Sequence, residues 1–169
     1  EFTKWMVNPI IFLDLDGVLN TINHLKRQKI ESGKATNKVW DPTACKHISL
    51  LCEHYNAKIV ITSSWRHEYT LEQLQEFFKS NNISDKFIID VTNSIAPQHD
   101  GNNYCRGHEV EHWLENNSNE ETSYVIIDDE AKFLESQQNY LVRVDKHKGF
   151  STKEAVINAS NILEDNSNR

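Results

Sequence analysis

The sequence predicts an α/β protein of three layers, in which helices cover both faces of a five-stranded, mainly parallel sheet. Five short runs are rich in β-branched residues and apolar almost throughout, which is typical of strands buried on both faces. Segments with apolar residues at helical spacing lie between these runs, so strand and helix alternate along the chain. Polar side chains gather directly after the runs, where parallel sheets carry their functional groups.

Apolar runs and helix-capping residues locate the individual strands and helices in the sequence. The predicted strands are residues 10–13, 58–61, 87–89, 124–127 and 141–144. Asp41 and Pro42 form an N-cap and first-turn pair that begins one helix. Thr70 and Gln73 form a capping box that begins another. Three more helices are expected, at about residues 107–116, in a short segment after Asp129 that contains Phe133 and Leu134, and in a last segment that Ser151 and Glu154 cap.

The length of the chain suits a single domain. Among its 169 residues we place that domain at 7–163, with flexible ends at 1–6 and 164–169. Glu1 and Phe2 are interpreted as a cloning remnant.

Charge and cysteine content narrow the class of protein. A net charge of −7 argues against a broad basic face for nucleic acid, although it allows a small positive pocket. Cys45, Cys52 and Cys105 are odd in number and lack C-x-x-C spacing, so we expect reduced thiols in a cytoplasmic protein. No apolar run approaches the ~20 residues that a membrane span needs. We therefore expect no membrane partner, and no obligate protein partner is evident.

Two carboxylates follow the first predicted strand. Asp14 and Asp16 lie where that strand ends, and Gly17 lets the chain turn. Alternation along a strand would point both carboxylates to the same side, about 7 Å apart. Two carboxylates in one pocket need a cation or a shared proton, and Mg²⁺ is the natural oxygen-bound partner. One carboxylate could then act as a nucleophile while the other exchanges a proton with the leaving group.

Other strands bring complementary groups to the same end of the sheet. Asp128 and Asp129 follow the fourth strand and add two more carboxylates. Thr62 and Ser63 follow the second strand and offer hydroxyls and backbone N–H groups to phosphate oxygens. Arg106 precedes a predicted helix and could balance the negative charge. Together these residues supply the nucleophile, acid, metal ligands and charge clamp that phosphate-ester hydrolysis requires.

In this order, the motifs resemble those of the haloacid dehalogenase (HAD) superfamily of phosphotransferases over about residues 10–145. More narrowly, Asp14-x-Asp16-Gly17-Val18-Leu19-Asn20 with Ser63-Ser64-Trp65-Arg66 is similar to the small HAD domains associated with RNA-repair systems. The resemblance implies a Rossmann-like HAD fold. It also implies a magnesium-dependent phosphomonoester hydrolase that acts through an aspartyl-phosphate intermediate.

The resemblance implies a role for each motif residue. Asp14 would be the nucleophile, and Asp16 would be the general acid and then the base that activates water. Either Thr62 or Ser63 would bind the phosphoryl group, and Arg106 would stand where many members have lysine. The implied metal ligands are Asp14, Asp16 through its backbone carbonyl, Asp128 and Asp129.

The family's cap is expected to be minimal here. About two dozen residues separate Asp16 from the helix near Pro42, enough for a flap, and the polar loop at 92–105 is too short for a cap domain. An open site would admit polymer ends, so the preferred substrate is a phosphorylated RNA or DNA end. A small nucleotide or sugar phosphate is the alternative.

Basic and aromatic residues near these motifs can each be interpreted in two ways. Trp65 and Arg66 could stack a base and bind substrate phosphate, or could pack against the sheet rim and pair with a site carboxylate. The flap residues could attract an anionic substrate or form a solvated charge run; they are His24, Lys26, Arg27 and Lys29.

Two hypotheses from other classes compete with the phosphatase. His108-Glu109-x-x-His112 matches the H-E-x-x-H signature of zinc hydrolases, although Val110 and Trp113 are needed on the buried face of the same helix. A non-catalytic phospho-acceptor module could also use an acidic pocket. Against it, Asp16 offers the general acid that turnover requires.

Overall fold

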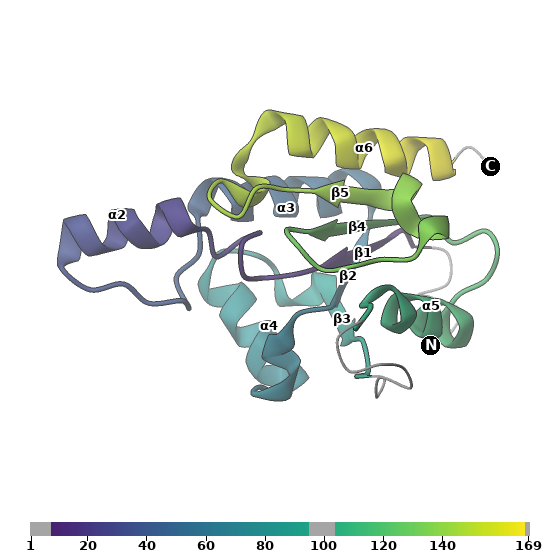
Figure 1. The fold of residues 1–169 in the computed structure, drawn as a ribbon, viewed down its shortest axis with the longest axis horizontal. Helices are drawn as coiled ribbons and strands as arrows, with labels where there is room; N and C mark the ends of the chain where they lie inside the picture. Colours follow the sequence, from purple (N-terminus) through teal and green to yellow (C-terminus); the bar gives the residue numbers. More distant parts are fainter. Residues whose placement is uncertain (1–7, 95–103, 168–169) are drawn as a thin grey trace.

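The computed structural model describes residues 8–94 and 104–167 of the chain. They form a fully parallel five-stranded sheet with the order β3-β2-β1-β4-β5, and helices cover both of its faces (Figure 1). The strands are β1 (Ile10–Leu13), β2 (Lys58–Ile61), β3 (Ile88–Val91), β4 (Tyr124–Asp128) and β5 (Leu141–Arg143). The predicted α/β fold with a parallel sheet is therefore confirmed.

Among the described residues, five α-helices and four short 3₁₀ helices accompany the strands. The α-helices are α2 (Ile22–Ser32), α3 (Pro42–Tyr55), α4 (Leu71–Ser80), α5 (Gly107–Asn117) and α6 (Lys153–Ser167). The 3₁₀ helices are η1 (Ser64–His67), η2 (Asp85–Phe87), η3 (Glu135–Tyr140) and η4 (Gly149–Ser151). Both predicted helix starts are confirmed, because the Asp41 carboxylate accepts from Thr43 and Ala44, and Thr70 and Gln73 form the capping box of α4.

Alternate side chains of β1 enter two separate cores. Ile11 and Leu13 pack in the core that α3 and α6 cover, whereas Ile10 and Phe12 pack in the core that α5 covers. Figure 1 shows α3 and α6 together on one side of the sheet and α5 on the other. Because every side chain of β1 is buried, a slip of one residue would bring each into the wrong core. The register therefore holds the residues that follow β1 in place.

The prediction of a short helix directly after Asp129 is wrong. Asp128 and its neighbours form a turn, in which the Asp128 Oδ1 atom accepts from the backbone N–H groups of Glu130 and Ala131 at 2.9 and 2.8 Å. A side chain that satisfies these donors makes the turn and offers the backbone an alternative to a helix. The apolar residues Phe133 and Leu134 precede η3 rather than lying in a helix.

The last helix differs from the prediction at both ends. Its capping side chain is Thr152, whose Oγ1 atom accepts from the N–H of Ala155 at 3.2 Å, rather than Ser151. The helix also continues to Ser167, past the expected domain end at residue 163, and the flexibility expected at 164–169 stays a prediction. The Tyr55 hydroxyl donates to the Glu164 carboxylate at 2.8 Å, which fastens this part of α6 to α3. The expected flexible end at 1–6 lies outside the described residues.

The segment predicted as a flap is a helix, α2, with a return loop. Thr21 caps its start and Gly33, in the left-handed region with φ of 77°, ends it. The prediction did not include this helix because α2 buries none of its residues and so lacks an apolar stripe. In the described residues, we find no helix that combines the length and the apolar character of a membrane span.

Candidate active site

Four parallel strands end at the same level and bring four polar residues side by side. Leu13 of β1 is in register with Ile61 of β2 and Ile127 of β4, and Ile61 is in register with Val91 of β3. The residues that follow these positions are Thr92, Thr62, Asp14 and Asp128, in the order of their strands. Asp14 and Asp128 are thus neighbours at the carboxyl edge of the sheet, as predicted.

Three carboxylates converge at this edge. One oxygen atom from each of Asp14, Asp128 and Asp129 lies within 4.8 Å of the others. Burial raises the pKa of Asp14 well above its usual range, the charge of Asp128 raises it further, and Arg106 lowers it. Burial also raises the pKa of Asp129, which hydrogen-bonds with Asp14. The cluster therefore disfavours its own full ionisation unless positive charge is added.

Gly17 makes room for this cluster. It has a φ of 79°, which strains any residue with a side chain. A Cβ atom at this position would collide with the carboxylate of Asp129. Glycine is therefore required both for the turn after the strand and for the approach of Asp129 to Asp14.

Two arginines supply positive charge to the cluster. Arg106 Nη1 donates to Asp128 Oδ2 at 2.8 Å and lies 3.5 Å from Asp14 Oδ1. Arg143 Nη1 lies 3.5 Å from Asp128 Oδ1. The sequence predicted Arg106 here but not Arg143, because Arg143 lies within a run assigned only as a strand. Because Asp128 pairs with both arginines, less positive charge is left to balance the carboxylates of Asp14 and Asp129.

Asp16 lies apart from the three converging carboxylates. The chain turns after Asp14 rather than continuing as a strand, with the N–H groups of Val18, Leu19 and Asn20 all donating to the Leu15 carbonyl. The expected 7 Å spacing along an extended strand is therefore not the relevant geometry. Asp16 is exposed, and its two oxygen atoms accept from Asn20 Nδ2 and Trp65 Nε1, each at 2.9 Å. These two bonds fix the orientation of the Asp16 carboxylate.

A pocket of about 440 Å³ opens over these residues. Its lining includes Asp14, Asp16, Arg106 and Asp129, together with Ser64 and Tyr104. The predicted nucleophile, the predicted acid and the charge clamp thus share one hollow at the carboxyl edge of the sheet with Asp129, a further metal-ligand candidate.

The donor set of the cluster fits a hard divalent cation. It offers carboxylate oxygens, which Mg²⁺ prefers over nitrogen or sulfur ligands. A divalent ion would also offset the burial and the repulsion from Asp128 that together raise the pKa of Asp14. Among the described residues, Asp14, Asp128 and Asp129 are the group of acids, histidines and cysteines with this convergence. The contribution predicted for Asp16 is through its backbone carbonyl, and it remains a prediction.

The sequence matches a known protein family over most of its length. The family model described as "HAD domain in Swiss Army Knife RNA repair proteins" matches residues 10–155. The chain belongs to this HAD family. Neither the curated proteins nor the solved structures contain a significant match. The predicted resemblance to small HAD domains of RNA-repair systems is confirmed, and the matched range contains every predicted site residue of this HAD domain.

The three hydroxyl-bearing residues that follow β2 lie in different environments. Ser63 Oγ accepts from the N–H of Trp65 at 3.2 Å and so caps η1. Thr62 Oγ1 is buried and has no hydrogen-bond partner in the structure. Ser64 is exposed and lines the pocket. The unsatisfied hydroxyl favours Thr62 over Ser63 as the phosphate-binding candidate. Ser64, which the sequence placed in the same motif without a separate role, has its side chain at the pocket.

Arg66 forms a buried ion pair in this HAD domain. Its Nη2 atom lies 2.7 Å from Glu109 Oε1, and the two side chains are 5% and 0% exposed. Nη1 donates to the Ser63 carbonyl at 2.7 Å, and Nη2 contacts the Tyr104 hydroxyl at 3.2 Å. Burial raises the pKa of Glu109 to about 6, and Arg66 opposes that rise. Of the two interpretations, the geometry favours a carboxylate-paired Arg66 that supports the phosphate loop, and direct phosphate contact stays a prediction.

The H-E-x-x-H residues of α5 do not converge. Glu109 is buried, where it bonds Arg66 and accepts from Thr92 Oγ1 at 3.2 Å. His108 and His112 are exposed on the same helix. A zinc hydrolase needs its glutamate beside the metal that both histidines hold. This arrangement separates them, so it does not favour the zinc hypothesis.

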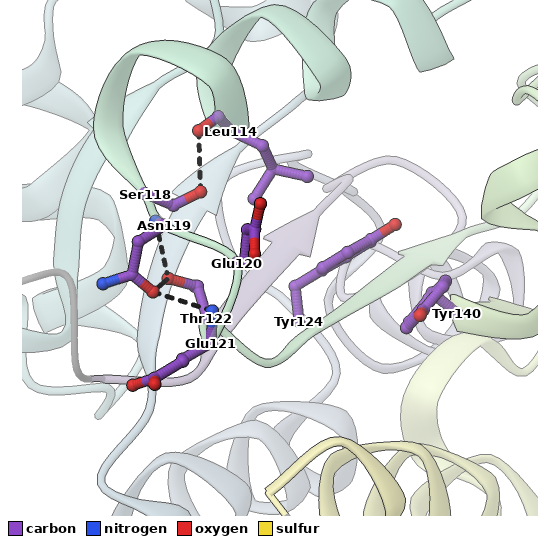
Figure 2. A pocket seen from close by; sticks show the side chains of 8 residues that line it. All are labelled: Leu114, Ser118, Asn119, Glu120, Glu121, Thr122, Tyr124 and Tyr140. Atoms are coloured by element: carbon purple, nitrogen blue, oxygen red, sulfur yellow. Dashed lines mark hydrogen bonds between the residues drawn. The ribbon is translucent and has the colours of Figure 1, made fainter. Parts of the chain in front are cut away.

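A second hollow, of about 460 Å³, lies at the opposite, amino end of the sheet beside Tyr124, the first residue of β4 (Figure 2). Figure 2 shows that the loop on one side is closed by its own hydrogen bonds, including Ser118 Oγ to the Leu114 carbonyl at 2.6 Å. Tyr124 stacks on Tyr140 with ring centroids 4.4 Å apart. None of the predicted site residues lines this hollow.

Replacing Trp65 by phenylalanine tests the positioning of Asp16. The variant keeps an aromatic ring against Trp40 and Phe77 but loses the donor to Asp16. We expect turnover to fall about tenfold for alkyl phosphates, which need leaving-group protonation, and much less for p-nitrophenyl phosphate. Rates measured with both substrates give the ratio.

The matched control is Trp113→Phe, which loses an indole bond of 2.8 Å to Asp90 on the other face of the sheet. If both tryptophan variants change the substrate ratio equally, Trp65 has no special role in holding Asp16.

Proposed function

We propose that this HAD domain is a magnesium-dependent phosphomonoesterase that acts through an aspartyl-phosphate on Asp14. The observation that supports this most is the convergence of Asp14, Asp128 and Asp129 beside Arg106, with Asp16 lining the same pocket. These groups match the requirements of phosphoryl transfer, namely a nucleophile, a proton donor and positive charge on the phosphoryl oxygens.

In the first step, a carboxylate oxygen of Asp14 attacks phosphorus and the bond from phosphorus to the ester oxygen breaks. Asp16, in its protonated form, gives its proton to that departing oxygen, so the alcohol leaves neutral. The hydrogen bonds from Trp65 and Asn20 orient Asp16 for this transfer. Arg106 lies beside Asp14 and would stabilise the charge on the transferring oxygens.

In the second step, water attacks the phosphorus of the aspartyl-phosphate. Asp16, now ionised, takes a proton from that water, and the bond between phosphorus and the Asp14 oxygen breaks. Inorganic phosphate leaves and both carboxyl groups return to their starting states. A stable phospho-acceptor would lack this step, so the presence of Asp16 in the pocket favours turnover.

Asp14, Asp128 and Asp129 would hold the magnesium ion. When bound, the ion supplies charge neutralisation for the carboxylates and the phosphoryl oxygens. Asp128 is positioned for this by the N–H groups of Glu130 and Ala131, which orient its Oδ1 atom.

The proposed substrate is a phosphorylated nucleic-acid end. Membership in a family described by RNA repair proteins supports this class. In the part of the chain that the structure describes, the pocket opens at the edge of the sheet and no cap domain covers it, which would suit the end of a polymer. A small nucleotide or sugar phosphate is the alternative within the same chemistry.

A panel of substrates tests the proposal. Phosphate release is measured with 3′- and 5′-phosphorylated RNA and DNA oligonucleotides, nucleoside monophosphates and sugar phosphates, in the presence of Mg²⁺. We expect at least tenfold higher kcat/KM for an oligonucleotide end than for the best small phosphate. Higher values for a nucleotide or sugar phosphate would replace the substrate assignment. No hydrolysis of any member, p-nitrophenyl phosphate included, would contradict the phosphatase itself.

A further inference from the structure

The insertion between Asp16 and α3 has a charge opposite to that of the whole chain. We call residues 22–40, which comprise α2 and its return loop, the basic arm. It contains five basic residues and one acidic residue, Glu31, whereas the chain has 18 basic and 25 acidic residues. The basic residues are Lys26, Arg27, Lys29, Lys34 and Lys38. All five are exposed.

The basic arm is ordered but largely uncovered. Figure 1 shows α2 projecting from the body of the molecule, and none of its residues is buried. Gln28 fastens the return loop to the helix, because its side chain donates to the carbonyls of Thr36 and Val39 and accepts from the N–H of Thr36. An isolated helix of this length is marginal in water, so these bonds and its caps maintain it. The exposed face of α2 is thus presented in a fixed shape.

Further bonds anchor the basic arm to the body. Arg27 Nη2 lies 3.4 Å from the Asp41 carboxylate, which caps α3. Asn81, after α4, accepts from the N–H of Trp40 and donates to the carbonyl of Lys38. Arg27 and the return loop therefore hold the basic arm against the body. On the projecting helix, Lys26 and Lys29 remain as the charges available to a ligand.

The base of the arm adjoins the active site. Helix α2 begins two residues after Asn20, whose amide holds Asp16. The N–H of Ile22 donates to the carbonyl of Lys146 at 3.1 Å, so the loop after β5 lies against the start of α2. That loop adds two exposed lysines, Lys146 and Lys148. Basic residues therefore extend from the loop after β5, beside the Asp14–Asn20 turn, along the projecting helix.

The charge pattern suits one class of ligand. A basic helix that binds a membrane surface needs an apolar stripe to enter the bilayer. Here the large apolar side chain that α2 exposes is Ile30, at 83%, among charged and polar neighbours. A row of lysines without such a stripe matches a polyanion, which gains affinity by releasing counterions.

We propose that the basic arm binds the phosphodiester backbone of a single-stranded nucleic acid whose phosphorylated end enters the pocket. This inference deepens the proposed function and rests on it for the position of the strand end. The 11 residues of α2 span about 16 Å at ~1.5 Å per residue, comparable to about five phosphates of a stacked strand at ~3.4 Å each. The arm would contact the backbone and read no base sequence, which is compatible with an otherwise acidic protein.

Binding of a fluorescein-labelled RNA 12-mer without a terminal phosphate, followed by anisotropy, tests the arm separately from catalysis. In the double variant Lys26→Gln/Lys29→Gln, we expect Kd to rise on the order of tenfold at 0.1 M salt. The slope of log Kd against log salt concentration should decrease by about 1.4, at ~0.7 per lost phosphate contact. The matched control is Lys79→Gln/Lys86→Gln, which removes two exposed lysines from α4 and η2.

Activity measurements complete the test. Hydrolysis of p-nitrophenyl phosphate should be unchanged in the arm variant, because Lys26 and Lys29 do not line the pocket, whereas KM for a phosphorylated oligonucleotide should rise. An arm variant that binds RNA as the control does would overturn the inference, even if oligonucleotide ends are hydrolysed. So would binding to anionic lipid vesicles but to neither RNA nor DNA. Conversely, arm-dependent RNA binding without hydrolysis of oligonucleotide ends would support the arm and contradict the proposed substrate.

Discussion

Substitution of Asp14 by asparagine is expected to reduce phosphate release at least about 10⁴-fold and to leave the fold intact. The amide cannot attack phosphorus to form the aspartyl-phosphate. Asp128 also lies beside Arg106, but its two oxygen atoms are engaged by Arg106, Arg143 and two backbone N–H groups. Without metal, the variant should also melt at a higher temperature. The reason is that the buried Asp14 carboxylate lies beside the charge of Asp128, and a neutral amide removes that repulsion.

Phosphate release from p-nitrophenyl phosphate and thermal melting in a chelator measure the two effects. Asp165→Asn, a change of the same type at an exposed position of α6, serves as the control and should alter neither. Turnover of the Asp14 variant at a wild-type rate would exclude Asp14 as the nucleophile. A variant with the far-ultraviolet circular dichroism of an unfolded chain would move the test to Asp14→Glu, which keeps the charge but displaces the oxygen atoms.

Removal of divalent cations should produce the second large effect. We expect a chelator to lower the rate of hydrolysis below about 1% and Mg²⁺ to restore it, because the carboxylates would otherwise repel the phosphoryl oxygens. Mg²⁺ at ~100 times its Kd should also stabilise the fold by about 2.7 kcal/mol, which a thermal melt detects as a rise in Tm. The gain has its physical origin in the three converging oxygens of Asp14, Asp128 and Asp129.

The same experiment separates the magnesium and zinc hypotheses. His112→Ala should leave the Mg²⁺-restored activity unchanged, because His112 is exposed on α5 and does not line the pocket. Restoration by Zn²⁺ but not by Mg²⁺, together with loss of activity in His112→Ala, would instead identify a zinc site and contradict the carboxylate cluster.

Local sequence was a good guide to the elements that place the site. The apolar run before Asp14 and the run before Asp128 both became buried central strands, and their common direction brings the two aspartates together. Residues whose partners are distant in sequence were harder to interpret. Arg66 could have faced the substrate, but Glu109 lies 43 positions later and pairs with it in the interior. No local pattern around Arg66 indicates that partner.

Periodicity and motif spacing were sufficient to predict the α/β class and the gathering of acidic residues at the carboxyl ends of the strands. Both depend on short-range pattern and on the geometry of parallel strands. The folded arrangement was needed to distinguish Thr62, with its unsatisfied hydroxyl, from Ser63, which caps η1. It was also needed to show that Trp65 holds Asp16 and that α2 stands clear of the body. These features depend on contacts between side chains that are far apart in the sequence. Tertiary packing determines such contacts, and no local pattern in the sequence indicates them.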